Sequence, residues 1–480
     1  MSKVFFLFLF VAMVVESSIA QEQLVMSAEQ TNRSPIMAKV KPKGKNVQSG
    51  ERYQMDWIYL QARTVSTLEG YKQKDVPIGR YGDRTDISLK KTGFFYTKKI
   101  DGKWWVVSPD GHPMIHVGVT SINLKYRNED NPVKRIRNSF EEKYGTKEKW
   151  GEDAISLLKR YEFNGAGCWA DEEQMRAYNQ RHDQPVSYVA HLSLLSDYRK
   201  TIDKSRGYHT SEQELFPIFE KGFEDYCASR AAELVAYKDD PNLFGYSFDN
   251  ELEWARDLLD TYLTLPENDP GYRAAKRWLA ERSLRPEGPF NDVIRDQFRA
   301  YVLDHYLSVA SKAIRKVDPN HMLLGSRFYW NDGIYYDHNQ SGMFTNPLVF
   351  ETAGKYVDIF QCNYYYRWTP VSKEINAWTE WSGKPFMITE WYVKGDDTNM
   401  ENKSGAGWIV ATQKDRGLFY QNFSLQLLES PNCVGWDWFR YQDKKGSNRG
   451  IVDYDFELYP EILKWMKEIN SQVYSLRDHF

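Results

Sequence analysis

Short apolar runs alternate with amphipathic segments over most of the chain, from about residue 114 to the C-terminus. Each run has the length of a strand, and each amphipathic segment has the spacing of a helix with one apolar face. The expected strands are 114–121, 163–169, 186–193, 243–250, 322–328, 357–365, 385–391 and 433–439. The expected helices are 150–161, 171–181, 219–238, 291–316, 349–356, 371–382, 413–428 and 459–475. Such alternation predicts parallel strands joined by helical crossovers.

Eight expected strands are the number that closes a (β/α)8 barrel, so we predict an α/β fold of the TIM-barrel type. The alternative is an open, doubly wound sheet, which needs a glycine-rich phosphate turn after an early strand. The turn after the first expected strand reads GVTSIN and lacks that pattern. In a barrel, the long connections after the strands lie on the C-terminal face. They are 122–148, 194–218, 252–290, 329–348, 392–412 and 440–458.

The N-terminus has the pattern of an export signal. Lys3 precedes an apolar stretch over 4–15, and Ser18-Ile19-Ala20 forms a small-x-small cleavage site. This arrangement is typical of a secretory signal peptide over residues 1–20. It predicts a secreted or periplasmic protein.

The rest of the chain divides at about residue 93. We expect a leader and N-terminal extension over 21–92, polar and flexible as far as residue 50. The barrel is expected over 93–480. Its first segment, 93–113, alternates around Asp101-Gly102 and predicts an N-terminal β-hairpin.

Composition excludes several classes of function. The formal net charge is −3 over 480 residues, whereas proteins that bind nucleic acid usually carry a basic excess. No second apolar run approaches the ~20 residues that a membrane span requires. The four cysteines are too few for a disulfide scaffold and are expected as small buried thiols, although one disulfide stays open in an exported chain. Neither CxxC nor HExxH occurs, so we expect no metal site and no cofactor.

Acidic residues end two of the expected strands. The fourth strand runs into Asp249, Asn250 and Glu251, and the seventh ends at Glu390. Burying an unpaired carboxylate is costly, so these strands are expected to leave the core at these residues. In a barrel the C-terminal ends of all strands surround one active-site mouth. Two carboxylates at such a mouth suit cleavage of a glycosidic bond, although strand-end acids can also serve in salt bridges.

The motifs around these acids resemble a known group of enzymes. GYSFDNE with a downstream ITEW resembles glycoside hydrolase clan A, whose members are retaining (β/α)8 enzymes. The segments GFFYTKKIDGKWWVVSPDGHPMIHVGVTSIN, FNGAGCW and WDWFRYQD…NRGIVD are similar to those of the family 50 β-agarases and their relatives. The resemblance covers about residues 93–475. It departs from that family because there is no room for a full separate carbohydrate-binding sandwich before the barrel.

The resemblance implies roles for individual residues. Glu251 would be the acid/base and Glu390 the nucleophile, with carboxyl groups roughly 5–5.5 Å apart in a retaining enzyme. Asn250 would bind the substrate 2-hydroxyl, or it could cap the following segment. A tyrosine after the sixth strand often touches the nucleophile in this clan. Alternation favours Tyr364 or Tyr366 over Tyr365, although such tyrosines can also be packing residues.

Aromatic, basic and histidine side chains near the strand ends are candidates for binding sugar. The tryptophans could stack on sugar rings or belong to the core; they are Trp169, Trp254, Trp330, Trp391, Trp436 and Trp438. Arg327, Arg367, Lys394 and Arg440 could meet anionic groups on a polysaccharide or form ordinary ion pairs. His191 could reach the substrate, whereas His116 is expected to be a hydrogen-bonded core residue.

These expectations predict a retaining hydrolase of a β-linked galactan such as agarose, or of its oligosaccharides. A β-galactosidase or another clan A β-glycosidase is the alternative within this class. An exported carbohydrate-binding barrel without catalysis is the alternative from another class, and the presence of both glutamates disfavours it. The oligomeric state and the exact sugar stay undetermined.

Overall fold

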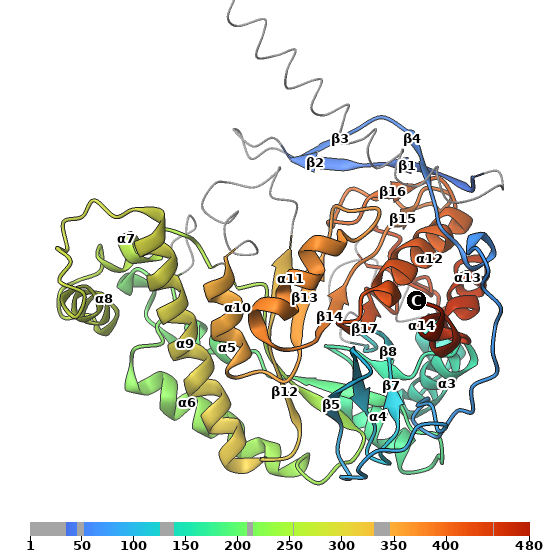
Figure 1. Cartoon of the computed structure of the whole chain (residues 1–480), viewed down its shortest axis with the longest axis horizontal. Coiled ribbons are helices and arrows are strands. Elements are labelled where there is room, and N and C mark those ends of the chain that lie inside the picture. The colour runs from blue at the N-terminus through green and yellow to red at the C-terminus, as the bar shows by residue number, and fades with distance from the viewer. Residues whose placement is uncertain are drawn as a thin grey trace, which may run out of the picture.

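The computed structural model describes residues 35–45, 52–124, 139–208, 215–252, 254–330, 346–444 and 446–480. Within them, eight parallel strands form a closed barrel (Figure 1). In chain order they are β8 (His116–Val119), β9 (Gly165–Ala166), β10 (Ser187–His191), β11 (Leu243–Asn250), β12 (Met322–Trp330), β13 (Phe360–Tyr364), β14 (Phe386–Glu390) and β17 (Cys433–Trp438). The predicted TIM-barrel architecture is therefore confirmed, and each strand overlaps its predicted range.

Helices connect the strands and cover the outside of the barrel. They include α3 (Lys147–Arg160), α4 (Glu172–Asn179), α5 (Leu194–Thr201), α6 (Lys221–Ala232), α9 (Asp292–Val317), α10 (Pro347–Gly354), α11 (Ser372–Ser382), α12 (Gln413–Glu429), α13 (Pro460–Asn470) and α14 (Val473–His479). Two further helices, α7 (Leu258–Tyr262) and α8 (Pro270–Ala280), lie in the long connection after β11. The single helix predicted over 459–475 is instead two, because α13 ends at Asn470 and α14 starts three residues later.

Polar groups pack inside the barrel next to glycines. The His116 imidazole is fully buried, and its Nε2 lies 2.9 Å from Oδ1 of Asp437 across the β17–β8 pair. A Cβ atom on Gly165 would lie 2.1 Å from the His116 ring, so this position has no room for a side chain. The expectation that His116 is a hydrogen-bonded core residue is confirmed. The buried pair keeps both side chains hydrogen-bonded, as burial of polar groups requires.

A small antiparallel sheet precedes the barrel. Strand β5 (Tyr96–Ile100) pairs with β6 (Lys103–Val107), which pairs with β7 (Pro113–Met114). Asp101 and Gly102 form the turn, both with positive φ (46° and 85°), the conformation that Asp-Gly adopts in tight hairpins. The hairpin contacts the barrel through the backbone, since Trp104 N donates to Pro431 O at 2.7 Å.

The segment before residue 50 is not a flexible leader throughout. Strand β1 (Met37–Lys41) pairs with β4 (Ile58–Gln61) on one side and with β16 (Ile409–Val410) on the other. Strand β16 also pairs with β15 (Lys394–Gly395), which follows the end of β14. The expectation of flexibility is therefore wrong for this part of the chain, because its backbone completes a sheet with the connection after the seventh barrel strand. The expected signal peptide, 1–20, lies outside the described residues.

All four cysteines are buried, and none is in a disulfide. Among the described residues, no helix is both long and apolar enough to cross a membrane.

Candidate active site

The two acids at the end of β11 and directly after it, Asp249 and Glu251, have different surroundings. The Asp249 carboxylate is fully buried and accepts backbone N–H groups of Leu195 and Ser196, both at 2.9 Å. It also accepts the Tyr306 hydroxyl at 2.7 Å, so this acid holds the start of α5. Glu251 has a left-handed backbone (φ 51°), and its N–H donates to Arg327 O of the neighbouring strand at 2.9 Å. Asp249 is therefore structural, whereas Glu251 is at the barrel mouth.

Glu390, the last residue of β14, is held by a cation and a phenol. Its carboxylate accepts Nη2 of Arg327 at 2.7 Å on Oε1 and the Tyr365 hydroxyl at 2.5 Å on Oε2. Only 5% of Glu390 is exposed, and Arg327 is fully buried. Arg327 also donates to the Thr389 carbonyl at 2.9 Å. A carboxylate in this setting is both charge-balanced and fixed in orientation.

Asn363 joins the two halves of the site. It lies on β13 in register with Glu390 of β14. Its Nδ2 donates to Oε1 of Glu251 at 2.8 Å and to Oδ1 of Asn250 at 3.1 Å. Its Oδ1 accepts the Thr389 hydroxyl at 2.9 Å. One amide therefore positions the predicted acid/base and the adjacent Asn250 relative to β14.

Glu251 holds its proton more tightly than an ordinary glutamate does. Burial, followed by the negative charge of Glu390, raises the pKa of Glu251 from its ordinary 4.5 to about 7. The amide of Asn363 and the guanidinium of Arg327 act in the opposite direction but less strongly. Burial also raises the pKa of the Tyr365 phenol well above its ordinary value, so at neutral pH this hydroxyl is a neutral hydrogen-bond donor. The arrangement suits a protonated Glu251 beside a hydrogen-bonded carboxylate.

Comparison with known proteins points to one group of enzymes. No family model matches the sequence. The chain is 23% identical over 509 aligned positions to beta-agarase B of Vibrio sp. (strain JT0107). That alignment covers 83% of this chain but 50% of the relative, so the chain spans about half the length of the relative it matches.

Solved structures share the fold over more of their length. The crystal structure of BpGH50 superposes with a TM-score of 0.78 and 27% identity, covering 93% of this chain and 96% of that one. An agarase, AgWH50C, superposes with a TM-score of 0.68 and 20% identity, covering 84% of this chain and 67% of that one. An exo-beta-agarase superposes with a TM-score of 0.67 and 19% identity, covering 85% and 68%. The sequence and fold comparisons thus support the resemblance to family 50 glycoside hydrolases.

Two predicted sugar-binding residues lie beside the carboxylate pair. The guanidinium of Arg327 lies over the Trp169 ring, 4.4 Å from its centroid. The Trp169 ring meets His191 edge-on at 5.5 Å, and His191 Nδ1 lies 3.4 Å from the Ser247 hydroxyl. Trp169 and His191 are both half-buried, so part of each side chain can reach a ligand. They therefore stay candidates for contact with a sugar.

Three predicted sugar-stacking tryptophans instead belong to the core. Trp391, Trp436 and Trp438 are fully buried. Trp391 stacks on Phe423 of α12 with a centroid distance of 4.2 Å. The Trp436 and Trp438 indole N–H groups donate to the Tyr420 hydroxyl and the Arg449 carbonyl, both at 3.0 Å. Their assignment to substrate is wrong because these rings face the helix layer and leave no face for a sugar.

The predicted choice among the three tyrosines is also wrong. Tyr364 packs against Trp378 and Phe423, and its hydroxyl donates to Glu374 at 3.2 Å. Tyr365 is the residue that reaches Glu390. Successive side chains of β13 alternate between its two faces, as expected. Asn363 faces the site, so Tyr364 faces outward and Tyr365 faces the site again. Strand β13 then ends, and Tyr366 has a left-handed backbone (φ 61°).

The remaining candidates whose side chains the structure describes are buried or paired with other residues of the protein. Trp254 is 3% exposed and packs against Phe216 and Tyr306, while the Trp330 side chain lies outside the described part of the chain. Arg367 pairs with Glu374 at 3.4 Å, and Lys394 donates to the carbonyls of Asn402 and Ser404. Arg440 is 1% exposed. No group of three or more metal-ligating acids, histidines or cysteines occurs among the residues that the structure describes.

The motifs did not reveal Asn363, and alternation ranked Tyr365 below its two neighbours. One signal was available for Asn363: in the run FQCNYY it is the polar residue at the end of the sixth expected strand. That is the level at which Glu390 ends the next strand. A search limited to acidic residues at strand ends misses Asn363.

Proposed function

We propose that this chain is a retaining β-glycoside hydrolase that cleaves agarose-type galactan or its oligosaccharides. The observation that carries the proposal is the linked pair at the ends of β11 and β14. Asn363 binds Glu251, while Arg327 and Tyr365 bind Glu390. The similarity to beta-agarase B supports the substrate class, and the superposition on BpGH50 supports the shared fold.

The pair of carboxyl groups suits a double displacement. Glu390 attacks the anomeric carbon, while Glu251 donates its proton to the leaving oxygen. This forms a glycosyl ester on Glu390. Glu251, now a carboxylate, removes a proton from water, which attacks the same carbon and releases the sugar. The raised pKa of Glu251 favours the protonated form needed for the first step.

The surrounding residues have supporting roles in this proposal. Asn250 binds the sugar 2-hydroxyl next to the reacting carbon, and its Oδ1 is already held by Asn363. Arg327 and Tyr365 each hold one oxygen of the attacking carboxylate, and the oxygen that does not bond to the sugar keeps its hydrogen-bond donor in the ester. Trp169 and His191 are the side chains proposed to contact the sugar. No step requires a cofactor, and we propose that the chain acts after export.

A polysaccharide panel tests the function directly. Purified protein is incubated with agarose, porphyran, carrageenans and plant β-glucans, and reducing ends are measured while products are separated by size. We expect reducing sugar from agarose, together with short products. The Glu390→Gln variant, purified in parallel, shows whether a contaminating enzyme contributes. Release from β-glucan alone would overturn the galactan assignment, and no release from any polymer would favour a non-catalytic binding barrel.

A further inference from the structure

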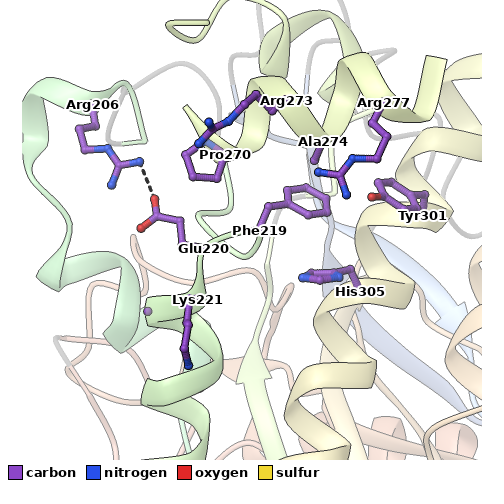
Figure 2. A pocket seen from close by; sticks show the side chains of 11 residues that line it. Arg206, Phe219, Glu220, Lys221, Pro270, Arg273, Ala274, Arg277, Tyr301 and His305 are labelled. Carbon is purple, nitrogen blue, oxygen red and sulfur yellow. Dashed lines mark ion pairs between the residues drawn. The ribbon is translucent and has the colours of Figure 1, made fainter. Parts of the chain in front are cut away.

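A groove of about 720 Å³ lies between α6, α8 and α9, away from the carboxylate pair (Figure 2). It shares no lining residue with the site around Glu251 and Glu390. In Figure 1, α8 lies at the left edge of the molecule, whereas the barrel strand β14 lies near the middle of the view. The groove belongs to the long connection that follows β11 and to the helices it packs against. It is therefore a concave surface separate from the proposed catalytic centre.

Two arginines in this groove carry unbalanced charge. Arg273 and Arg277 are one turn apart on α8, line the groove and are exposed. Neither forms an ion pair with a residue that the structure describes, and Glu281 pairs instead with Arg282. The third guanidinium, Arg206, is already neutralised by Glu220 at 2.5 Å and by Asp269 at 2.8 Å.

An aromatic surface lies below the two free arginines. Phe219 stacks with Tyr301 at a centroid distance of 5.5 Å and an interplanar angle of 17°, and with His305 at 4.8 Å and 29°. Figure 2 shows Arg277 above Tyr301, with Phe219 and His305 beside them. Burial lowers the pKa of His305, so its ring is neutral at neutral pH and adds flat surface without a charge.

The α6 N-terminus also lines the groove. Lys221 and Gly222 line it, the Lys221 ammonium pairs with Asp225 at 2.6 Å, and the helix N-cap residue Glu220 makes no side-chain hydrogen bond to the first turn. The first-turn N–H groups therefore present the positive end of the helix dipole at the surface. Because the whole chain has a net charge of −3, the positive character is local and is not a general polyanion surface.

We propose that this groove is a non-catalytic binding site for a galactan segment that carries sulfate ester groups. The proposal rests on the proposed function, which makes a galactan the polymer that the enzyme meets. Guanidinium groups match the oxygens of a tetrahedral or planar anion with paired hydrogen bonds, so Arg273 and Arg277 bind the sulfates. The aromatic rings of Tyr301 and Phe219 receive the apolar face of a sugar ring. The site would hold a sulfated stretch of the polymer while the catalytic pair acts elsewhere on the chain.

Calorimetry on catalytically inactive protein tests the groove. The Glu390→Gln protein is titrated with sulfated galactan oligosaccharides and with neutral agarose oligosaccharides of the same length. We expect the added double change Arg273→Gln/Arg277→Gln to weaken binding of the sulfated ligand at least about tenfold, because two charged hydrogen-bonding groups are lost. Binding of the neutral ligand should not change. In the otherwise native enzyme, the same double change should leave agarose hydrolysis unaffected.

A matched control removes the same charge elsewhere. Lys312→Gln/Lys316→Gln deletes two exposed cations, also one turn apart, from α9 outside the groove and should leave the affinity unchanged. An unchanged affinity in the arginine variant, or an equal loss in the lysine variant, would overturn the proposal. An equal affinity for dextran sulfate would show that the groove recognises charge without the galactan and would also overturn it. The proposed function is tested separately, by hydrolysis of agarose with the native enzyme. If the native enzyme does not hydrolyse agarose, the proposed function is refuted, and the binding measurement on the inactive variant is unaffected.

Discussion

The two glutamates at the barrel mouth have contrasting surroundings. Glu390 binds a guanidinium and a phenol, whereas Glu251 binds one neutral amide. One buried cation, Arg327, can balance one of the two negative charges, and it contacts Glu390 directly. A single proton on Glu251 therefore completes the charge balance of the pair. Both residues are glutamates near the ends of barrel strands, so the side chain itself does not distinguish the acid/base from the nucleophile. The hydrogen-bonding partners of each carboxyl group distinguish them.

The strongest way to break this comparison is to remove the proposed nucleophile. Glu390→Gln keeps the size of the side chain but cannot form a glycosyl ester, so we expect turnover to fall at least about 10⁴-fold. A mechanism-based fluorosugar should label Glu390 in the native enzyme, as peptide mass spectrometry would show. Label on Glu251 would exchange the two roles. Label on neither residue would contradict double displacement.

Removal of the proposed acid/base should have a smaller effect that depends on the substrate. Glu251→Ala should slow cleavage of poor leaving groups by about 10²–10⁴-fold, because proton donation is lost. An activated aryl glycoside needs no proton, so its first step should survive in stopped-flow measurements. Azide should then restore turnover by attacking the intermediate without a base. A variant that is insensitive to azide and equally slow on both substrates would contradict the assignment.

The pH profile sharpens the same assignment. Glu251 must be protonated for the first step, and its pKa is raised to about 7 by burial and by the charge of Glu390. In the native enzyme, kcat/KM on a poor leaving group should therefore fall as pH rises above about 7. The Glu251→Ala variant should lose this basic limb on the activated aryl glycoside. A basic limb that persists there would assign it to another group.

The hydroxyl that holds Glu390 offers a milder test. Tyr365→Phe removes one hydrogen bond to a charged carboxylate, which is worth about 1.5–3 kcal/mol, so we expect kcat to fall about 10–100-fold. Tyr364→Phe is the matched control, because it removes the neighbouring hydroxyl, which binds Glu374 outside the site. Steady-state kinetics on one substrate compare the two. Equal losses in both variants would mean that the effect is general loosening of the β13 end.

Sequence patterns predicted the barrel and its acids better than the residues around them. Strand β11 coincides with its predicted range, since a long apolar run ends there in three polar residues. Parallel strands in a closed barrel then bring Glu251 and Glu390 to one face. The phase of a short strand is a different matter. The three tyrosines are alike, and only Asn363 directly before them sets the phase that turns Tyr365 toward the site and Tyr364 away from it.

The tryptophans show why aromatic character alone did not predict binding. Trp169 and Trp391 both follow a strand end, and both were expected to contact sugar. Trp169 is half-buried against Arg327, but Trp391 is covered by Phe423 and Tyr420 of α12. The difference arises because α12, which is distant from Trp391 in the sequence, packs on the Trp391 ring. Burial of a given ring therefore follows from the whole fold and not from its neighbours in sequence.

The smallest expected effect is on the free energy of unfolding. Measuring it in variants of the two glutamates compares them without any substrate. Because the folded-state pKa of Glu251 is raised from its ordinary 4.5 to about 7, the native state binds this proton more tightly than the unfolded state does. The unfolding free energy should therefore fall as pH rises through this range, and the loss is complete above about pH 7. Glu251→Gln cannot ionise, so it should gain about 1–3 kcal/mol over the native protein between pH 5 and pH 8.5. Denaturant unfolding at both pH values measures the difference, with the exposed Glu380→Gln as the control for loss of a surface carboxyl.

Glu390→Gln should destabilise the protein at both pH values, because Arg327 is then left buried without its counter-charge. A Glu251→Gln gain that does not depend on pH would mean that the proton on Glu251 is not what distinguishes the two carboxyls.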